Sequence, residues 1–256
     1  WRGVGARFNA GRAPNCSFFA VGSTIHNLPR RATPAIVWGT GLQEPIPPLD
    51  ARHRADTHVL ATRGPLTWEA LRKSGAARAA GDDGGGPAFG DPGLLAAALF
   101  YRHVRYNGSS YGTKECIVPH IKEKAELRSC ERTRSRPAWL RQERREVDCF
   151  SPALELLAFL RRLLQCERIV TSSLHATVFA DAFHIPVRLK PVQQGLVGVK
   201  YRDYLSVVRP GLEVDEHLHR SFAAAYEAAP LPLVTRQHLA SVGLRLVEVL
   251  MKQCNV

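Results

Sequence analysis

The feature that most constrains the fold of this chain is a repeated order of segments. A short apolar, β-branched run is followed by a small or polar corner and then by a helix-like stretch, and this order recurs along the sequence. Alternation of this kind predicts an α/β protein. In the first half we predict strands at 17–21, 35–38 and 58–62.

Helix signals complete this pattern. Pro65 suits the first position of a helix and Gly75 can end it, so we predict a helix between them. The apolar run 93–100 predicts a second helix. A Ser-Pro pair at 151–152 predicts the start of another, which we expect to reach Cys166 along a leucine stripe.

The second half continues the α/β pattern. After a loop-like stretch at 106–112 we predict, in order, strand 115–119, strand 168–174, helix 176–183, strand 186–189 and closing helices 214–228 and 238–252. Because turn-forming residues gather in that loop, we place a domain boundary there and expect domains 1–105 and 106–256.

The sequence is strongly basic, with 35 Lys and Arg against 23 Asp and Glu and a formal net charge of +12. This excess favours anionic partners such as phosphorylated substrates, acidic polymers, nucleic acid or a membrane surface, and charge alone does not choose among them. Much of the excess is Arg in an Ala-rich and Gly-rich background, which biased codon usage also explains. We interpret the charged segment 122–148 as solvated surface in preference to a nucleic-acid patch.

The six cysteines are scattered, with no C-x-x-C pair and no zinc-like spacing, so we predict ordinary thiols and leave disulfides open for a lumenal protein. The histidines show no metal-ligand grouping, and a Walker P-loop and a complete dinucleotide motif are absent. We therefore predict no metal and no nicotinamide or ATP cofactor. No apolar run approaches the roughly 18 residues of a membrane-spanning helix.

Candidate site residues lie at strand ends, because open α/β sheets bind ligands beyond the carboxyl ends of their strands. Ser172, Ser173 and His175 gather at one such corner, with hydroxyls that bind anions and an imidazole that exchanges protons. Spacing alone favours a helix-capping role for these residues.

Other corners offer single candidates. Arg63 can hold a carboxylate or phosphate in a bidentate fork, and the alternative is a salt-bridged surface arginine. His120 follows a further strand, and Lys200 and Asp203 add a cation and a carboxylate near each other in sequence. Each of these signals is weak by itself.

Taken in order, the corners resemble the successive motifs of polysaccharide pyruvyl transferases. The residues that carry the resemblance are Val21-Gly22-Ser23-Thr24-Ile25, Val37-Trp38-Gly39-Thr40-Gly41, Arg63-Gly64-Pro65-Leu66-Thr67, Gly90-Asp91-Pro92-Gly93-Leu94-Leu95, Pro119-His120, Thr171-Ser172-Ser173-Leu174-His175-Ala176, Ala180-Asp181-Ala182-Phe183-His184-Ile185-Pro186 and Lys200-Tyr201-Arg202-Asp203-Tyr204. Their order carries more weight than any one of them.

Members of this family transfer the pyruvyl group of phosphoenolpyruvate to two hydroxyls of a sugar, forming a cyclic ketal and releasing phosphate. The resemblance implies a transferase of glycan or exopolysaccharide biosynthesis, with two Rossmann-like α/β domains arranged as in GT-B glycosyltransferases. It also implies a truncated N-terminal domain, because a Gly-Asn-x-Gly-Asp type opening is missing before the first motif. Many relatives have Arg or Met near Ser173 and Gly at the position of Ala176.

On this resemblance we assign roles as hypotheses. Phosphoenolpyruvate is the donor substrate, bound by the domain 106–256, and a sugar or oligosaccharide is the acceptor, bound by the domain 1–105. Substrate binding is assigned to Arg63, Ser172, Ser173, Leu174, Lys200 and Asp203. Among these, Arg63 and Lys200, with the helix start after His175, hold the anionic donor. His175 is the general acid, and His120 or Asp91 assists the acceptor.

Two other functions remain as alternatives. A GT-B glycosyltransferase that uses a nucleotide sugar would need a similar basic cleft. A non-catalytic binder of anionic polymers would explain the charge without turnover, although we do not expect a nucleic-acid partner. The compartment stays open: cytoplasmic for a bacterial protein, or the Golgi lumen for a eukaryotic one whose N-terminal anchor precedes Trp1.

Overall fold

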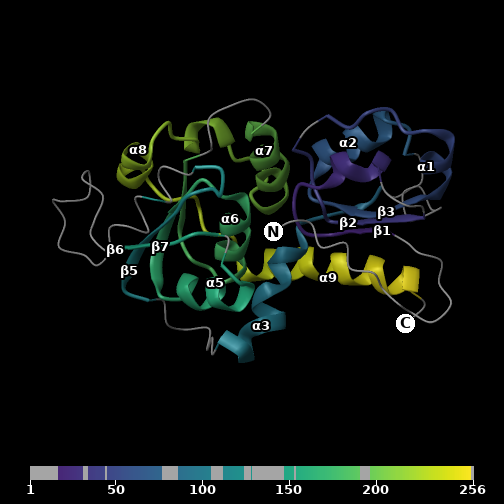
Figure 1. Cartoon of the computed structure of the whole chain (residues 1–256). Coiled ribbons are helices and arrows are strands. Elements are labelled where there is room, and N and C mark those ends of the chain that lie inside the picture. Colours follow the sequence, from purple (N-terminus) through teal and green to yellow (C-terminus); the bar gives the residue numbers. More distant parts are fainter. Residues whose placement is uncertain are drawn as a thin grey trace. The chain divides into compact units, whose positions relative to one another are not determined.

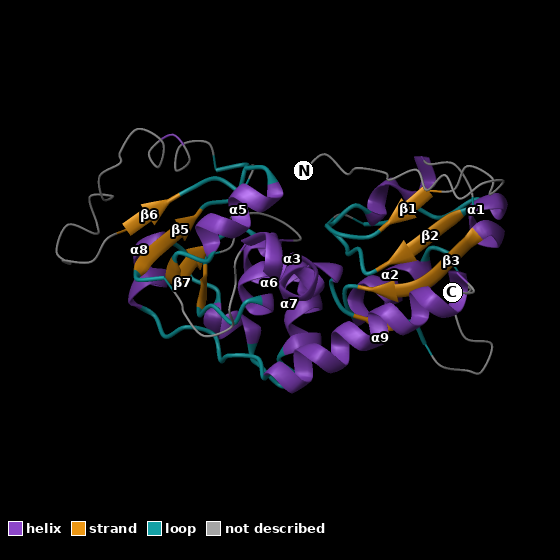
Figure 2. Ribbon diagram, turned by 90° about the horizontal axis from the view of Figure 1, so that it is seen from below, coloured by secondary structure: helices purple, strands orange, loops and turns teal. Residues whose placement is uncertain are grey.

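The computed structural model of this chain describes residues 17–30, 34–43, 45–76, 86–104, 112–123, 128, 147–152, 154–190 and 197–254. Contacts group the chain into two compact units. The first contains the described parts of 1–92, 198–212 and 237–256, and the second those of 93–197 and 213–236. Each unit is built on a four-stranded parallel sheet (Figures 1 and 2). The predicted α/β class is confirmed.

The first sheet has the strand order β1, β2, β3, β4. These strands are β1 (Ser17–Phe19), β2 (Ala35–Trp38), β3 (Thr57–Thr62) and β4 (Ala88–Phe89). The first three lie at the predicted runs. Successive side chains of a strand point to opposite faces, so β2 buries Val37 in one core cluster while Trp38 donates a 2.7 Å hydrogen bond from Nε1 to the carbonyl of Leu246.

The helical segments of the first unit are η1 (Ile25–Arg30), α1 (Ala51–Asp56), α2 (Pro65–Lys73), α7 (Val197–Val208) and α9 (Arg236–Cys254). As predicted, α2 has Pro65 at its start, and Gly75 follows its end with a positive φ of 98°. Leu71 packs α2 into the core beside β1 and β2, whereas α9 lies along the other face of the sheet (Figure 1). The predicted C-terminal closing helix 238–252 is therefore confirmed as α9.

The second sheet has the strand order β6, β5, β7, β8. Its strands are β5 (Lys114–Val118), β6 (Val147–Cys149), β7 (Cys166–Thr171) and β8 (Val187–Leu189). The helical segments around it are η2 (Pro92–Leu95), α3 (Ala96–Val104), α5 (Leu156–Leu163), α6 (Leu174–Ala182), η4 (Val214–His217) and α8 (Phe222–Glu227). The predicted βαβ unit is confirmed as β7, α6 and β8.

Opposite faces of the second sheet carry different helices. Phe222 and Tyr226 of α8 pack against Ile117 and Val170 of the sheet. Helices α5 and α6 lie on the other side in both ribbon views (Figures 1 and 2). Covering both faces is what a parallel sheet requires, because its strands are apolar on both sides.

The start of α5 differs from the prediction. The helix begins at Leu156 and not after the Ser-Pro pair at 151–152. Its N-cap is Glu155, whose carboxylate accepts hydrogen bonds from the amides of Leu157 and Ala158 at 3.3 and 3.2 Å. A carboxylate at this position satisfies amides that have no partner within the helix, and it suits the helix dipole.

Two further boundaries differ. α6 begins at Leu174, two residues earlier than predicted, so His175 lies within the first helical turn and not in the corner before it. The predicted helix 214–228 is divided into η4 and α8, because Leu218 between them pairs with Leu189 at the end of β8. Ser173, the N-cap, marks the first of these boundaries, and the pairing of Leu218 marks the second.

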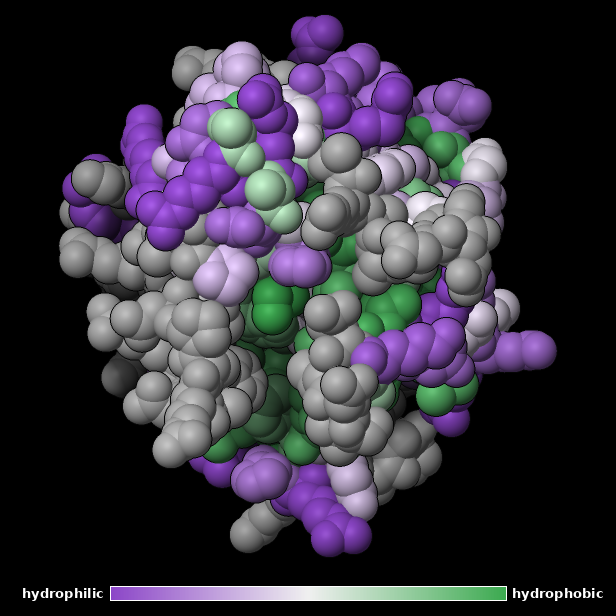
Figure 3. Space-filling model, turned by 90° about the vertical axis from the view of Figure 1, so that its right-hand side faces the viewer, coloured by the Kyte–Doolittle hydropathy of each residue, from purple (hydrophilic) through white to green (hydrophobic). Residues whose placement is uncertain are grey.

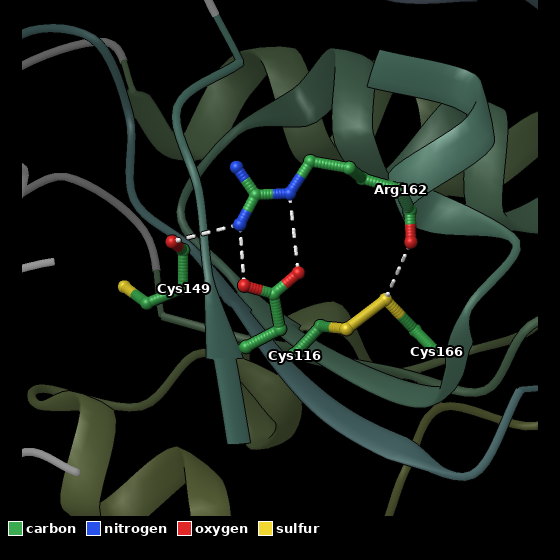
Figure 4. Close-up of a disulfide and its surroundings, with 5 residues drawn as sticks. Cys116, Cys149, Arg162 and Cys166 are labelled. Carbon is green, nitrogen blue, oxygen red and sulfur yellow. Dashed lines mark hydrogen bonds and ion pairs between the residues drawn. A yellow bond between two sulfur atoms is a disulfide. The ribbon is translucent and has the colours of Figure 1, made fainter. Parts of the chain in front are cut away.

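The prediction of ordinary thiols is wrong for Cys116, Cys149 and Cys166, each of which takes part in a disulfide. Cys116 of β5 and Cys166 of β7 form a disulfide with a Cα–Cα distance of 5.7 Å (Figure 4). Both residues are buried. Beside them, Arg162 of α5 forms an ion pair with Asp148 of β6. The disulfide therefore joins two neighbouring parallel strands inside the second unit.

Several predicted features lie wholly or mostly outside the described residues. These are the Gly-rich loop 81–86, the loop 106–112 and the charged segment 122–148.

In the described part, apolar side chains such as Leu99, Leu233 and Leu244 are exposed. Figure 3 shows one face, with hydrophobic residues near its centre and hydrophilic residues gathered at its top. Among described helices, none combines the length and hydropathy that crossing a membrane requires.

Candidate active site

The second sheet has a topological switch point between β5 and β7. From β5 the chain continues to β6 on one side, whereas β7 and β8 follow on the other side. Connections that leave in opposite directions open a crevice beyond the carboxyl ends of the strands, where open α/β sheets bind ligands. The residues that follow β5 and β7 therefore frame the candidate site.

Ser172 and Ser173 follow β7 and lead into α6. Ser173 is the N-cap of this helix, and its amide donates a 2.9 Å hydrogen bond to Thr171 Oγ1. Both serines and Leu174 are buried, whereas His175 is half-buried in the first helical turn. The capping role that spacing alone favoured thus belongs to Ser173, and His175 occupies the helix itself.

His120 lies across the switch point, after β5. Its amide donates to Ser172 Oγ at 2.7 Å and to Glu123 Oε2 at 2.9 Å. Its Nδ1 accepts a 3.2 Å hydrogen bond from the amide of Lys122, and the imidazole is half-buried. The structure thus brings together two residues, His120 and Ser172, that the sequence placed at separate corners.

Sequence reasoning missed two residues of this edge, Glu123 and Lys190. Glu123 receives a hydrogen bond from Ser172 Oγ and forms an ion pair with Lys190, which directly follows β8. Both are buried. The position of Lys190 at a strand end was a usable signal, whereas Glu123 fell in the segment that we interpreted as solvated surface.

In the first unit, Arg63 follows β3 and is completely buried. Its guanidinium donates to Ser23 Oγ at 2.7 Å and to the carbonyl of Leu42 at 2.8 Å, and Nε lies 3.4 Å from Asp203 Oδ2. Burial lowers the pKa of Arg63, while the charges of Asp203 and Asp91 act in the opposite direction. Because an arginine stays protonated in proteins, Arg63 is an internal cation that joins several loops.

Asp203 of α7 caps another helix. Its carboxylate accepts hydrogen bonds from the amide and the hydroxyl of Thr67, at 3.0 and 2.5 Å, in the first turn of α2. The N-cap of α2 is Gly64, which offers no side chain, and a Cβ built there would lie 2.0 Å from the backbone oxygen of Asp203. This close approach lets a carboxylate that is distant in sequence satisfy an amide in the first turn of α2.

The remaining predicted site residues of this unit are also buried. Asp91 follows β4 and contributes to the charge around Arg63. Lys200 lies on α7, with Nζ 5.2 Å from the centre of the Tyr201 ring. A cation over an aromatic face is stabilised by the electrostatic field of the ring.

The nine predicted site residues fall into two groups, each described within its own unit. One group surrounds the edge of the second sheet and contains His120, Ser172, Ser173, Leu174 and His175; the other lies in the first unit and contains Arg63, Asp91, Lys200 and Asp203. Their individual roles in binding and catalysis stay predictions. No group of three or more potential metal ligands is found among the described residues.

A family model described as polysaccharide pyruvyl transferase matches residues 12–189. This range includes β1 to β8 and every predicted site residue except Lys200 and Asp203. The chain belongs to the polysaccharide pyruvyl transferase family. Membership of this family implies a transferase with a glycan acceptor. Searches of curated proteins and of solved structures found no match.

Proposed function

We propose that this polysaccharide pyruvyl transferase family member transfers the pyruvyl group of phosphoenolpyruvate to two hydroxyls of one sugar in a glycan. Family membership supports the reaction class. The proposed position of the active site is supported by one observation: the His120 amide donates a hydrogen bond to the Ser172 hydroxyl across the switch point of the second sheet. A ligand crevice is expected beyond these strand ends.

The reaction forms two C–O bonds at C2 of the donor and breaks the bond between C2 and the phosphate oxygen. The two sugar hydroxyls lose two protons, and one proton is added to the methylene carbon, which becomes a methyl group. The other leaves with the phosphate. The enzyme therefore needs a proton donor for the methylene carbon, a base for the hydroxyls and groups that bind two anions.

His175 is the general acid of this proposal. It is half-buried in the first turn of α6, where backbone amides and the helix dipole favour an anionic group of the donor nearby. His120 assists an acceptor hydroxyl, supported by its half-buried imidazole at the neighbouring strand end. Asp91 is a weaker candidate for the second role, because its carboxylate is buried beside Arg63.

Arg63 takes a revised role in the proposal. Binding an external anion would require its guanidinium to leave Asp203, Ser23 and Leu42, all of which it contacts in the interior. We therefore assign Arg63 and Asp203 to holding the loops at the edge of the first sheet. Lys200, which α7 carries in the first unit, is retained as a donor-binding cation. Two Rossmann-like domains of the GT-B type are also part of the proposal.

The donor is tested by thermal shift and by turnover. We expect phosphoenolpyruvate, and not UDP or GDP, to raise the melting temperature, because a ligand that binds only the folded state stabilises it. Phosphate release should require both phosphoenolpyruvate and a galactosyl acceptor, and mass spectrometry of the acceptor should show an added pyruvyl ketal. Stabilisation by UDP or GDP alone would instead indicate a nucleotide-sugar glycosyltransferase and contradict the proposal.

A further inference from the structure

A buried ion pair connects the segments that follow β5 and β8, beside the switch point. Lys190, after β8, pairs with Oε1 of Glu123, which lies in the turn after β5. The relative exposure of the two side chains is only 10% and 7%. Burying two charges costs several kcal/mol before their attraction is counted, so the pair by itself is not evidence of stability.

The second carboxylate oxygen of Glu123 is used as well. Oε2 accepts hydrogen bonds from the Ser172 hydroxyl and, at 2.9 Å, from the His120 amide. The His120 amide also reaches Ser172 Oγ at 2.7 Å. One carboxylate therefore sets the orientation of the Ser172 hydroxyl and of the turn that carries His120.

The backbone already joins these strand ends without the ion pair. The Lys190 amide donates to the carbonyl of Thr171 at 2.9 Å, and Thr171 Oγ1 donates to the carbonyl of Val118 at 2.7 Å. The ammonium group of Lys190 also lies 4.8 Å from the centre of the Phe222 ring of α8. The charged pair is therefore not needed to connect β5, β7 and β8. What it adds is the orientation of the Ser172 hydroxyl and of the turn that carries His120.

We propose that Glu123, held by Lys190, is a positioning residue that orients Ser172 and His120 for the pyruvyl transfer reaction. This inference rests on the proposed function. In this role, Glu123 and Lys190 need not touch a substrate. A buried, paired carboxylate is suited to it, because fully satisfied polar networks restrict side chains to one arrangement.

The test replaces both charges with apolar side chains of similar length, in the double variant Glu123→Met/Lys190→Met. We expect Glu123→Met alone to lower the melting temperature, because Lys190 remains buried without its partner, and the double variant to recover most of that loss. Turnover should not recover: kcat should stay about 10- to 100-fold below the parent, with a smaller change in KM, since Ser172 and the His120 turn have lost their acceptor. Lys190→Arg, which keeps the pair, should retain most of kcat.

The matched control is Glu69→Met/Lys73→Met, which removes an exposed ion pair on α2. It should leave kcat unchanged. If kcat returns together with the melting temperature in the Glu123→Met/Lys190→Met variant, the pair is only structural and the inference is overturned.

Hydrogen exchange separates this inference from the proposed function. The His120 amide should exchange slowly in the parent and faster in Glu123→Met/Lys190→Met, whatever reaction the protein catalyses. If the parent releases no phosphate, the proposed function fails, while the exchange rate still decides whether Glu123 holds this turn. Equal exchange in both proteins would overturn the positioning role.

Discussion

Oδ2 of Asp203 lies 3.4 Å from Nε of Arg63, and neither side chain is exposed. The two residues come from α7 and from the corner after β3, which are far apart in the sequence. Because Asp203 also accepts two hydrogen bonds from Thr67, one carboxylate neutralises a buried cation and caps α2. Arg63 and Asp203 were predicted separately as substrate-binding residues, and the structure makes them partners of each other.

Removing this carboxylate should strongly destabilise the protein. In Asp203→Ala, Arg63 keeps its buried charge without an ion-pair partner and α2 loses its cap. We expect the free energy of unfolding to fall by about 3–5 kcal/mol, measured by urea denaturation. The control is Glu69→Ala, which removes an exposed ion pair with Lys73 and should change the free energy of unfolding little. Similar losses in both variants would contradict the assigned importance of the buried pair.

Gly41 should not tolerate a methyl group. A Cβ added at this position would lie 2.0 Å from Cζ of Arg63, so Gly41→Ala must displace the guanidinium from its hydrogen bonds. We expect a lower melting temperature and a loss of at least about 1–3 kcal/mol, as for overpacked cores. Gly198→Ala is the matched control: it lies in α7 with its nearest neighbour at 3.5 Å, and should be neutral or stabilising by up to about 1 kcal/mol. Equal effects would argue against the steric explanation.

The disulfide between Cys116 and Cys166 should contribute to stability. It closes a loop with a sequence separation of 50, and such cross-links typically contribute about 2–4 kcal/mol, chiefly by restricting the unfolded chain. We expect Cys116→Ala/Cys166→Ala to unfold at a correspondingly lower urea concentration under non-reducing conditions. With a reductant present throughout denaturation, the difference from the parent should shrink. Two reactive thiols at these positions in the unfolded, unreduced parent would refute the cross-link.

His184 should make stability depend on pH. Burial lowers its pKa below the ordinary value of 6.5, and the charge of Arg236 acts in the same direction. A lowered pKa means that the unfolded chain binds more protons, so this contribution is present above pH 6.5 and is lost as the pH falls through the folded pKa. Asparagine tolerates the positive φ of 58° at this position. When the pH is lowered from about 7 to about 5, the melting temperature of His184→Asn should therefore fall less than that of the parent. An unchanged drop would show that His184 is not responsible.

His175→Ala should abolish most turnover while leaving the fold intact. His175 is half-buried in α6, and general acid catalysis typically contributes about 100- to 10,000-fold. We expect a fall of this size in kcat for phosphate release, with a small change in melting temperature. His103→Ala on the exposed side of α3 is the control and should retain parental kcat. A rate close to the parent's in His175→Ala would remove this residue from the mechanism.

Much of the fold could be predicted because its signals are local. The runs that became β2 and β3, and Pro65 at the start of α2, depend on residues adjacent in sequence. The start of α5 could not be predicted in the same way. Two capping signals competed, and the carboxylate of Glu155 prevailed over the Ser-Pro pair at 151–152.

The candidate site was predicted only in outline. Strand-end reasoning identified His120 and Ser172 but could not place them within 2.7 Å of each other, because that depends on the order of strands in the sheet. It also missed Glu123, whose pairing with Lys190 gives no local pattern. The sequence left two interpretations of Arg63 open, a substrate-binding residue and a salt-bridged surface residue. In the structure Arg63 is buried and pairs with Asp203 in the interior.

The sequence by itself determined that this is an α/β chain, because hydrophobic periodicity, caps and turn residues act over a few positions. Its ordered corners resemble the motifs of the polysaccharide pyruvyl transferase family, to which the chain belongs. Only the tertiary structure decided how the charged side chains are paired. Asp203 reaches Thr67 across a sequence separation of 136, and Lys190 reaches Glu123 across 67. Such pairs form because a buried charge must find a partner wherever the folded chain brings one near, and no short-range pattern records that choice.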